Sequence, residues 1–221
     1  MINLNKKIEF KISADGGSAS GKTTGCHIIS KKFKMSFLSS GTLYRYCALR
    51  IIENKKNYDK NYINKITKSI TAKKLNNKKL YNPDVATLAS KIAKKLYVRK
   101  ALKTFQKNFI NNSRLTIIEG RDIGSKIMTN ADLKLFFTCS INKKAKRRFK
   151  EFKLLNNKIT LKQVEKALIQ RDKDDIRRKI SPLIMPKNAV LVDTTNLSIK
   201  QMEAKLTKIV KKSIKMKYGS L

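Results

Sequence analysis

Apolar residues in this chain form short runs that alternate with longer stretches of helical periodicity. Alternation over residues 8–14 predicts a first strand, and two apolar runs, 115–119 and 133–138, are typical of buried parallel strands. Shorter apolar runs at 36–38 and 189–192 bring the set to about five. Strands separated by helical stretches predict an α/β fold with a central parallel sheet.

Amphipathic stretches between these runs predict the helices. They cover residues 22–34, 42–52, 84–96, 98–110, 142–155, 161–172 and 199–212, with Ser198 placed to cap the last one. Residues 57–81 are polar, lysine-rich and poorly periodic, which predicts a surface insertion that is part helix and part hairpin. Residues 173–186 are charged and end at a proline, which predicts a mobile loop. We expect the residues after 212 to be frayed.

A glycine-rich loop follows the first predicted strand and precedes the first predicted helix. Its residues match G-x-x-x-x-G-K-[ST] and are Gly16, Gly17, Ser18, Ala19, Ser20, Gly21, Lys22 and Thr23, with Thr24 next in the chain. Glycines let the backbone curl so that its N–H groups face phosphate oxygens, and the helix N-terminus favours negative charge. The motif predicts that the loop binds ATP, that Lys22 reaches the β- and γ-phosphates, and that Thr23 ligates Mg²⁺. A glycine turn before a helix is the structural alternative.

Asp15 lies directly before this loop, at the carboxyl end of the predicted strand, where ligands bind in such sheets. It is expected to contact Mg²⁺ through water or to contact the acceptor, and the alternative is a carboxylate that caps the turn. His27, the single histidine, falls inside the first predicted helix and fits a helix-surface or packing residue better than a catalyst.

Charge is the unusual feature of the composition. The 221 residues carry 52 Lys and Arg against 15 Asp and Glu, a formal net charge of +37. Such an excess is compatible with nucleic-acid binding. The lysines run through nearly every segment with little aromatic interleaving, which favours solvated helix faces instead, so no specific nucleic-acid partner is expected.

The remaining composition indicates one cytoplasmic domain. The hydrophobic share of 41% is enough for a core, and no apolar stretch approaches the roughly 18 residues that a membrane span needs. The first residues lack the apolar core of an export signal. Cys26, Cys47 and Cys139 are odd in number and widely spaced, which argues against a disulfide framework and a zinc site.

Four further segments stand in order along the chain. Residues 39–45 read S-S-G-T-L-Y-R, and residues 85–90 read V-A-T-L-A-S, followed by V-R at 98–99. Residues 118–124 read I-E-G-R-D-I-G, and residues 170–183 read Q-R-D-K-D-D-I-R-R-K-I-S-P-L. Together with the glycine-rich loop, these segments resemble the bacterial cytidylate kinase family of P-loop nucleoside monophosphate kinases, over residues 8–212.

The resemblance implies a P-loop NTPase-type three-layer fold and transfer of the terminal phosphate of ATP to CMP or dCMP. With Asp15, taken from its position before the loop, it implies a substrate-binding set of Ser40, Tyr44, Arg45, Ser90, Arg99, Arg121, Asp122, Arg171, Asp175 and Arg178. Catalysis would fall to Lys22, Arg121, Asp122, Arg171 and Arg178. The turn at residues 193–195 would lie near adenine.

The sequence departs from the family pattern at several positions. Ser39 and Glu119 replace family aspartates, Asp174 and Ile176 stand where arginine is frequent, and Arg177 is additional. The resemblance also implies a single, monomeric kinase domain. Its core would be residues 8–52, 98–155 and 187–214, with a monophosphate-binding insert at about 53–97 and a lid at about 156–186.

Three alternatives stay open at this point. A P-loop kinase for UMP, AMP or shikimate would share the donor loop but need another acceptor cluster. A nucleic-acid-associated P-loop NTPase would account for the charge. A non-catalytic basic binding protein would leave the loop unexplained.

Overall fold

The computed structural model describes residues 8–54, 58–153 and 159–219. The chain divides into two compact units, one made of Met1–Leu38 with Arg114–Leu221 and the other of Ser39–Ser113. Parts of the predicted insert and lid, the end of the predicted helix at 142–155 and the first residues, predicted to lack an export signal, lie outside the described residues. The division into core, insert and lid stays a prediction.

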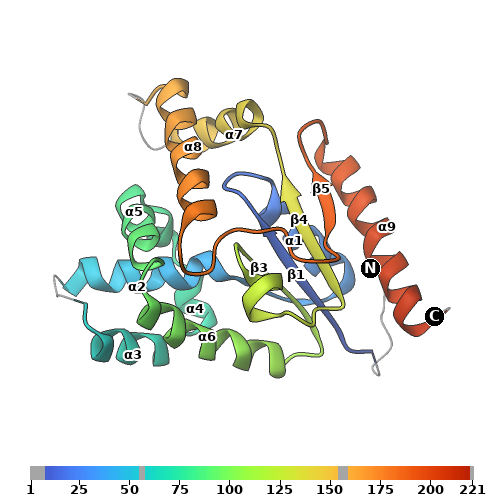
Figure 1. Ribbon diagram of the computed structural model, residues 1–221, viewed down its shortest axis with the longest axis horizontal. Coiled ribbons are helices and arrows are strands. Elements are labelled where there is room, and N and C mark those ends of the chain that lie inside the picture. Colours follow the sequence, from blue (N-terminus) through green and yellow to red (C-terminus); the bar gives the residue numbers. More distant parts are fainter. Residues whose placement is uncertain (1–7, 55–57, 154–158, 220–221) are drawn as a thin grey trace. The chain divides into compact units, whose positions relative to one another are not determined.

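The first unit is built on a five-stranded sheet (Figure 1). Its strands are β1 (Phe10–Gly16), β2 (Ser36–Ser39), β3 (Leu115–Gly120), β4 (Leu133–Thr138) and β5 (Val190–Asp193), in the order β2-β3-β1-β4-β5. β1 pairs in parallel with both β3 and β4, with Ile12 opposite Ile117 and Leu133, and β4 pairs in parallel with β5. The predicted α/β fold with a five-stranded parallel sheet is therefore confirmed.

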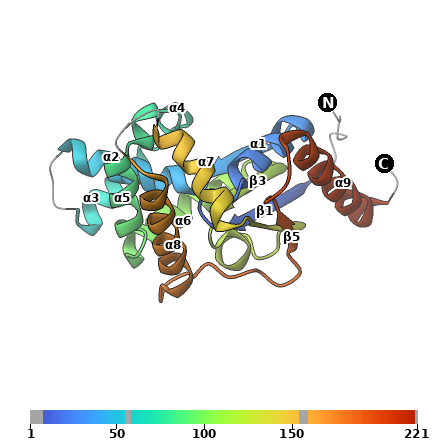
Figure 2. The ribbon, with the colours of Figure 1, turned by 90° about the horizontal axis from the view of Figure 1, so that it is seen from above.

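Helices α1 (Lys22–Phe33) and α9 (Ile199–Tyr218) pack against this sheet in one apolar core (Figure 2). β1 contributes Phe10, Ile12 and Ala14, which are fully buried, and β4 contributes Leu135 and Phe137. α9 has buried residues four positions apart, Met202, Leu206, Val210 and Ile214, which is a spacing of one helix face. Ser198 caps α9 in a capping box with Gln201, as its position predicts.

Two further helices of this unit, α7 (Ile141–Lys153) and α8 (Leu161–Arg177), form a smaller apolar cluster. Ala145 of α7 and Val164 and Leu168 of α8 are buried in it, and Ala19 of the glycine-rich loop packs against them. A short π-helical turn, η2 (Ile123–Ile127), follows β3. α8, which lies within the predicted lid, is therefore part of an apolar cluster that contacts the loop through Ala19.

After Ser39, which ends β2, the described residues of the second unit form helices joined by short turns. The unit contains α2 (Ser40–Asn54), α3 (Lys60–Lys68), α4 (Ala72–Leu75), η1 (Lys78–Tyr81), α5 (Pro83–Ile92) and α6 (Leu96–Asn111). Leu43, Ile63, Leu80, Ile92 and Leu102 are fully buried in it. Each of the short helices begins at a polar cap, with Asp59, Thr71 and Asn77 accepting a backbone N–H two or three residues later.

Several predicted boundaries were wrong. The described residues of the 57–81 segment form two α-helices and a 3-10 helix and contain no hairpin. The predicted loop at 173–186 begins too early, because α8 continues to Arg177. α9 also continues to Tyr218, beyond the predicted end at residue 212. Leu96 begins α6 instead of ending the preceding helix.

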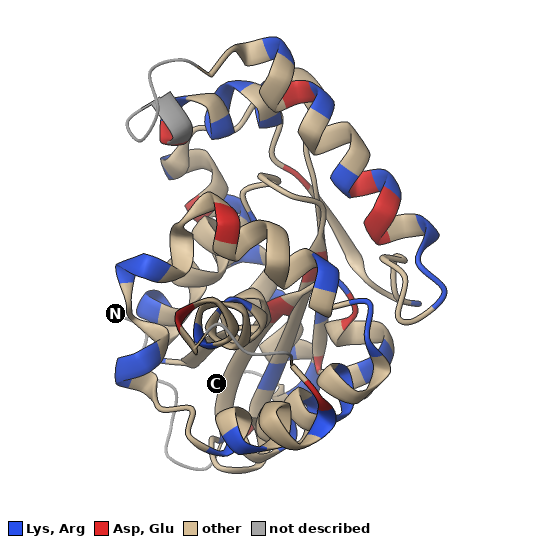
Figure 3. Ribbon diagram, turned by 90° about the vertical axis from the view of Figure 1, so that its left-hand side faces the viewer, with Lys and Arg blue, Asp and Glu red and all other residues tan. Residues whose placement is uncertain are grey.

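Lys and Arg recur along the helices of the chain, whereas Asp and Glu are few (Figure 3). In the described part of the chain, no helix is long and apolar enough to cross a membrane.

Candidate active site

The glycine-rich loop joins β1 to α1. At two of its glycines, Gly16 and Gly21, a residue with a Cβ would clash or be strained. Gly16 has φ +150°, and a Cβ there would lie 2.3 Å from the Phe137 carbonyl oxygen. Gly21 has φ +77° and precedes α1 in the left-handed region, which glycine enters without steric cost. Ser20 Oγ donates to the Gly17 carbonyl at 3.0 Å, and Thr194 Oγ1 donates to the Ser20 carbonyl at 2.9 Å. The loop is thus tied to itself and to the turn after β5.

Lys22 and Thr23, the first residues of α1, converge on the carboxylate of Glu119 at the end of β3. Lys22 Nζ lies 3.3 Å from Glu119 Oε2, with 9% and 4% of the two side chains exposed. Thr23 Oγ1 is 2.9 Å from each Glu119 oxygen. Thr23 and Thr24 are exposed, unlike Lys22. A buried charge needs a partner, and Glu119 serves Lys22 in this role.

Asp15, at the end of β1, is fully buried and caps the turn after β3. Its Oδ1 accepts the Ile123 N–H at 2.8 Å and its Oδ2 accepts the Gly124 N–H at 2.7 Å. Burial raises the pKa of Asp15 to about 6, although these two hydrogen bonds oppose the change. The geometry therefore matches the capping alternative for this residue.

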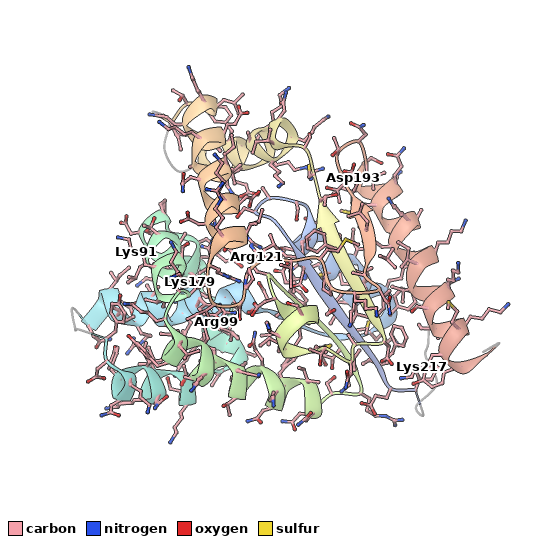
Figure 4. All side chains as sticks on the ribbon, in the orientation of Figure 1. Lys91, Arg99, Arg121, Lys179, Asp193 and Lys217 are labelled. Atoms are coloured by element: carbon pink, nitrogen blue, oxygen red, sulfur yellow. The ribbon has the colours of Figure 1, made fainter. Side chains whose placement is uncertain are left out.

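Arg121, directly after β3, links the loop to the lid (Figure 4). Its Nη2 donates to Ser18 Oγ at 2.9 Å, and its Nε donates to Asp175 Oδ2 of α8 at 2.7 Å. Arg178 Nη1 lies 3.3 Å from Asp175 Oδ1, and Arg178 Nη2 lies 3.9 Å from Asp122 Oδ1. The predicted residues of the G-R-D segment and of the lid therefore form one ion-pair network.

The charges of this network change the pKa values of its members. Burial raises the pKa of Asp175, but the adjacent Arg121, followed by Arg178 and Arg171, brings it below its usual value. Burial lowers the pKa of Arg121, but Asp175, Asp172 and Glu119 raise it above its usual value. Both groups are therefore held ionised by their mutual contact.

A second lid carboxylate lies directly on the loop. Asp172 Oδ1 accepts the Ser18 backbone N–H at 3.0 Å, and Asp172 Oδ2 lies 2.8 Å from Lys144 Nζ of α7. Both groups are close against Gly17, since a Cβ on that residue would lie 2.9 Å from the Lys144 nitrogen and 3.0 Å from Asp172 Oδ2. A loop amide that could bind an anion is thus already bound to one.

Arg147, also on α7, holds the turn after β5. Its Nη1 donates to Thr194 Oγ1 at 3.0 Å and its Nη2 donates to the Thr194 carbonyl at 2.8 Å. Because Thr194 in turn contacts Ser20, α7, the 193–195 turn and the glycine-rich loop are joined by side-chain hydrogen bonds.

The second unit contains a separate cluster of candidate residues. Ser40 is the first residue of α2, which begins two residues before the predicted helix at 42–52. Its buried Oγ accepts from Gln106 Nε2 of α6 at 2.8 Å. Arg99 of α6 is buried, donates to the Ala93 carbonyl at 3.1 Å, and places its guanidinium 5.7 Å from the centroid of the Tyr44 ring.

Arg45, one residue after Tyr44, is held from η1. Its Nη1 donates to the Leu80 carbonyl at 2.7 Å, and its guanidinium lies 5.5 Å from the centroid of the Tyr81 ring. Ser90 is half-buried on α5. The structure therefore brings Ser40, Tyr44 and Arg99 together with Gln106, and it fixes Arg45 beside η1.

Sequence reasoning missed several residues as site candidates. Glu119 was seen only as a variant of the family acid, although an acid at the end of a buried strand was a usable signal. Asp172 belongs to the segment at 170–183 but was assigned no role, and Lys144 gave no local signal, because α7 and α8 bring both to the loop only in the folded chain. Among the described residues, no three His, Cys, Asp or Glu side chains gather as a metal cluster.

Comparison with known proteins agrees with these features. The family model described as Cytidylate kinase matches residues 12–212. A cytidylate kinase of Thermosipho melanesiensis is 34% identical over 215 residues, covering 93% of this chain and 99% of the relative. One of Rickettsia felis is 34% identical over 220 residues, covering 97% and 100%.

Solved structures resemble the chain in fold alone. Protein TT1252 of Thermus thermophilus aligns with a TM-score of 0.52 at 14% identity, covering 93% of this chain and 98% of that protein. An uncharacterized protein of Eubacterium ventriosum aligns with a TM-score of 0.51 at 10% identity, covering 92% and 99%.

Proposed function

We propose that residues 16–24 of this chain, which belongs to the cytidylate kinase family, bind ATP together with Mg²⁺. The chain is a nucleoside monophosphate kinase that phosphorylates CMP and dCMP. One observation carries the assignment of the site. Lys22 belongs to the loop motif, Arg121 binds Ser18 of the same loop, and Arg178 shares the Asp175 carboxylate with Arg121. The Ser18 amide already binds a carboxylate. Such a cluster suits an anion of high charge.

The oxygen groups beside Lys22 fit a magnesium ion. Thr23 Oγ1 and both Glu119 carboxylate oxygens lie within hydrogen-bond distance of one another, and Mg²⁺ prefers hard oxygen ligands. Thr23 would hold the ion, with Glu119 beside it. When bound, Mg²⁺ neutralises charge on the phosphate oxygens.

The arginines and Lys22 would stabilise the charge of the transferring group. Lys22 contacts the β- and γ-phosphates, while Arg121, Arg171 and Arg178 neutralise the γ-phosphoryl group as its charge spreads. Asp175 keeps Arg121 and Arg178 oriented, because its two oxygens each bind one of them. Asp122, which also lies near Arg178, is the proposed partner of the acceptor nucleotide.

The acceptor would be held by the cluster in the second unit. Arg45 and Arg99 are proposed to bind the monophosphate with Tyr44, since a guanidinium fork matches two phosphate oxygens at once. Ser40 and Ser90 would complete the site through hydroxyl hydrogen bonds. Ordered side chains such as Arg45, which donates to the Leu80 carbonyl, reduce the entropy lost on binding.

The reaction itself needs positioning more than acid–base chemistry. A phosphate oxygen of CMP, already negatively charged, attacks the γ-phosphorus of ATP. The new O–P bond forms in line as the bond from the γ-phosphorus to the β,γ-bridging oxygen breaks, giving CDP and ADP.

A coupled ADP-release assay tests the proposal with CMP, dCMP, UMP, AMP and shikimate as acceptors. ADP release with CMP and dCMP alone, lost in Lys22→Ala, is the expected result. Release with another acceptor would contradict the acceptor assignment, and near-normal turnover in Lys22→Ala would contradict the donor site. That the enzyme is a cytoplasmic monomer stays a prediction, whose oligomeric part light scattering tests.

A further inference from the structure

Asp172 of α8 makes a direct hydrogen bond to the backbone of the glycine-rich loop. Its Oδ1 accepts the Ser18 N–H at 3.0 Å, and only 18% of its side chain is exposed. Backbone amides of such loops bind phosphate oxygens. A carboxylate oxygen is chemically similar to a phosphate oxygen, so Asp172 binds an amide that could instead bind a phosphate oxygen.

Lys144 completes this arrangement from α7. Its Nζ lies 2.8 Å from Asp172 Oδ2, with 13% of the side chain exposed, and 2.9 Å from the place where a Gly17 Cβ would be. The next residue, Ala145, is buried against Val164, Leu168 and Ala19. This packing fixes the backbone of α7 beside the loop, so Lys144 stays within reach of the loop when its carboxylate partner leaves.

A phosphate arriving at the Ser18 amide must therefore displace a carboxylate and leave a cation beside it. A lysine this close to a loop-bound anion gains a charge-assisted hydrogen bond to whichever anion is present. Within the donor site proposed above, we infer that Lys144 is a further ligand of the ATP phosphates. Asp172 occupies the position of one ATP phosphate oxygen until ATP binds. ATP and Asp172 compete for the same amide and the same lysine.

Two single variants separate the competitor from the ligand. Asp172→Ala removes the competing anion, so ATP is expected to bind several-fold more tightly, as measured by calorimetry. Lys144→Ala removes a cation and also leaves Asp172 unpaired at the loop, so its weakening of ATP binding has two causes.

The double variant resolves those causes. Relative to Asp172→Ala alone, Lys144→Ala/Asp172→Ala is expected to bind ATP about tenfold more weakly, since a hydrogen bond to a charged group is lost without any remaining carboxylate effect. Equal affinity in these two variants would overturn the inference, because Lys144 would then only neutralise Asp172. Unchanged or weaker binding by Asp172→Ala would overturn the competition.

The control variant is Lys143→Ala, which removes the same charge from an exposed neighbouring position on α7 and is expected to change ATP affinity little. Lys144→Arg, which keeps the charge, is expected to retain most of the affinity, and thermal melts establish that each variant is folded. If residues 16–24 were not the ATP site, the result would differ, because ATP would then bind the wild-type protein and Lys22→Ala equally.

Discussion

Replacing Lys22 with methionine separates its part in stability from its part in catalysis. Methionine keeps most of the length and apolar stem of the lysine but has no charge. In the nucleotide-free protein the change leaves Glu119 buried beside Thr23 without its cationic partner. During turnover it leaves the transferring phosphate without one of its proposed cations.

The structure sets the size of both effects. Removing one partner from a buried ion pair costs about 3–5 kcal/mol, and Lys22 and Glu119 have 9% and 4% of their side chains exposed. Because Thr23 still donates to Glu119, we expect a loss near the lower end, about 3 kcal/mol in the free energy of unfolding. Loss of one group that stabilises developing charge lowers kcat by about 10²–10³-fold.

Urea unfolding and the ADP-release assay are measured on wild type, Lys22→Met, Glu119→Gln and the double variant. Removing the Glu119 charge relieves the buried carboxylate, so the double variant is expected to regain most of the stability but none of the turnover. Near-normal turnover in Lys22→Met would refute the catalytic role. Stability losses that simply add in the double variant would refute the pairing.

Three further predictions concern pH, packing and acceptor binding. Burial raises the pKa of Asp15 from 3.8 to about 6, so its contribution to stability is present below pH 3.8 and is lost as the pH rises through 6. Over that range, the free energy of unfolding of wild type should fall by roughly 3 kcal/mol relative to that of Asp15→Asn. A pH-independent difference between the two proteins in urea unfolding would contradict this. Gly25→Ala places a Cβ 2.8 Å from the Phe137 ring and should cost about 1–3 kcal/mol, seen as a lower Tm. Gly41→Ala, where the only atom within 4 Å is a serine oxygen at 3.8 Å, is its control and should not lower Tm. Arg45→Ala should raise KM for CMP far more than for ATP, and equal effects would count against its proposed role.

The sheet and the loop could be predicted because their signals are local. Buried parallel strands are continuous apolar runs, and the loop geometry depends on glycines at fixed spacing, such as Gly16 and Gly21. The helical content of residues 57–81 was also encoded locally, by the caps Asp59, Thr71 and Asn77, but weak periodicity concealed it. The extension of α8 to Arg177 has no apolar signal, since its last turn is mostly charged.

The network around the loop depends on tertiary distances that no spacing reveals. Arg121 and Asp175 are 54 residues apart and Ser18 and Asp172 are 154 apart, and only the packing of α8 on the loop brings them together. The resemblance to a family named Arg121 and Asp175 in advance. It included Asp172 in the lid pattern without assigning it a role and gave no indication of Lys144, because the contacts of both residues with the loop are tertiary.

The contact between β1 and α9 has a consequence for how the chain folds. The Tyr218 hydroxyl donates to the Glu9 carbonyl and Lys217 Nζ donates to the same oxygen at 2.9 Å, across 208 or more residues of sequence (Figure 4). α9 also covers core residues of the strand that leads into the loop. During synthesis, this core on β1 is therefore only partly covered, by residues such as those of α1, until α9 has also been made. Such long-range closure is slow and exposes aggregation-prone surface, so we expect yield in cells to depend on chaperones and on expression temperature.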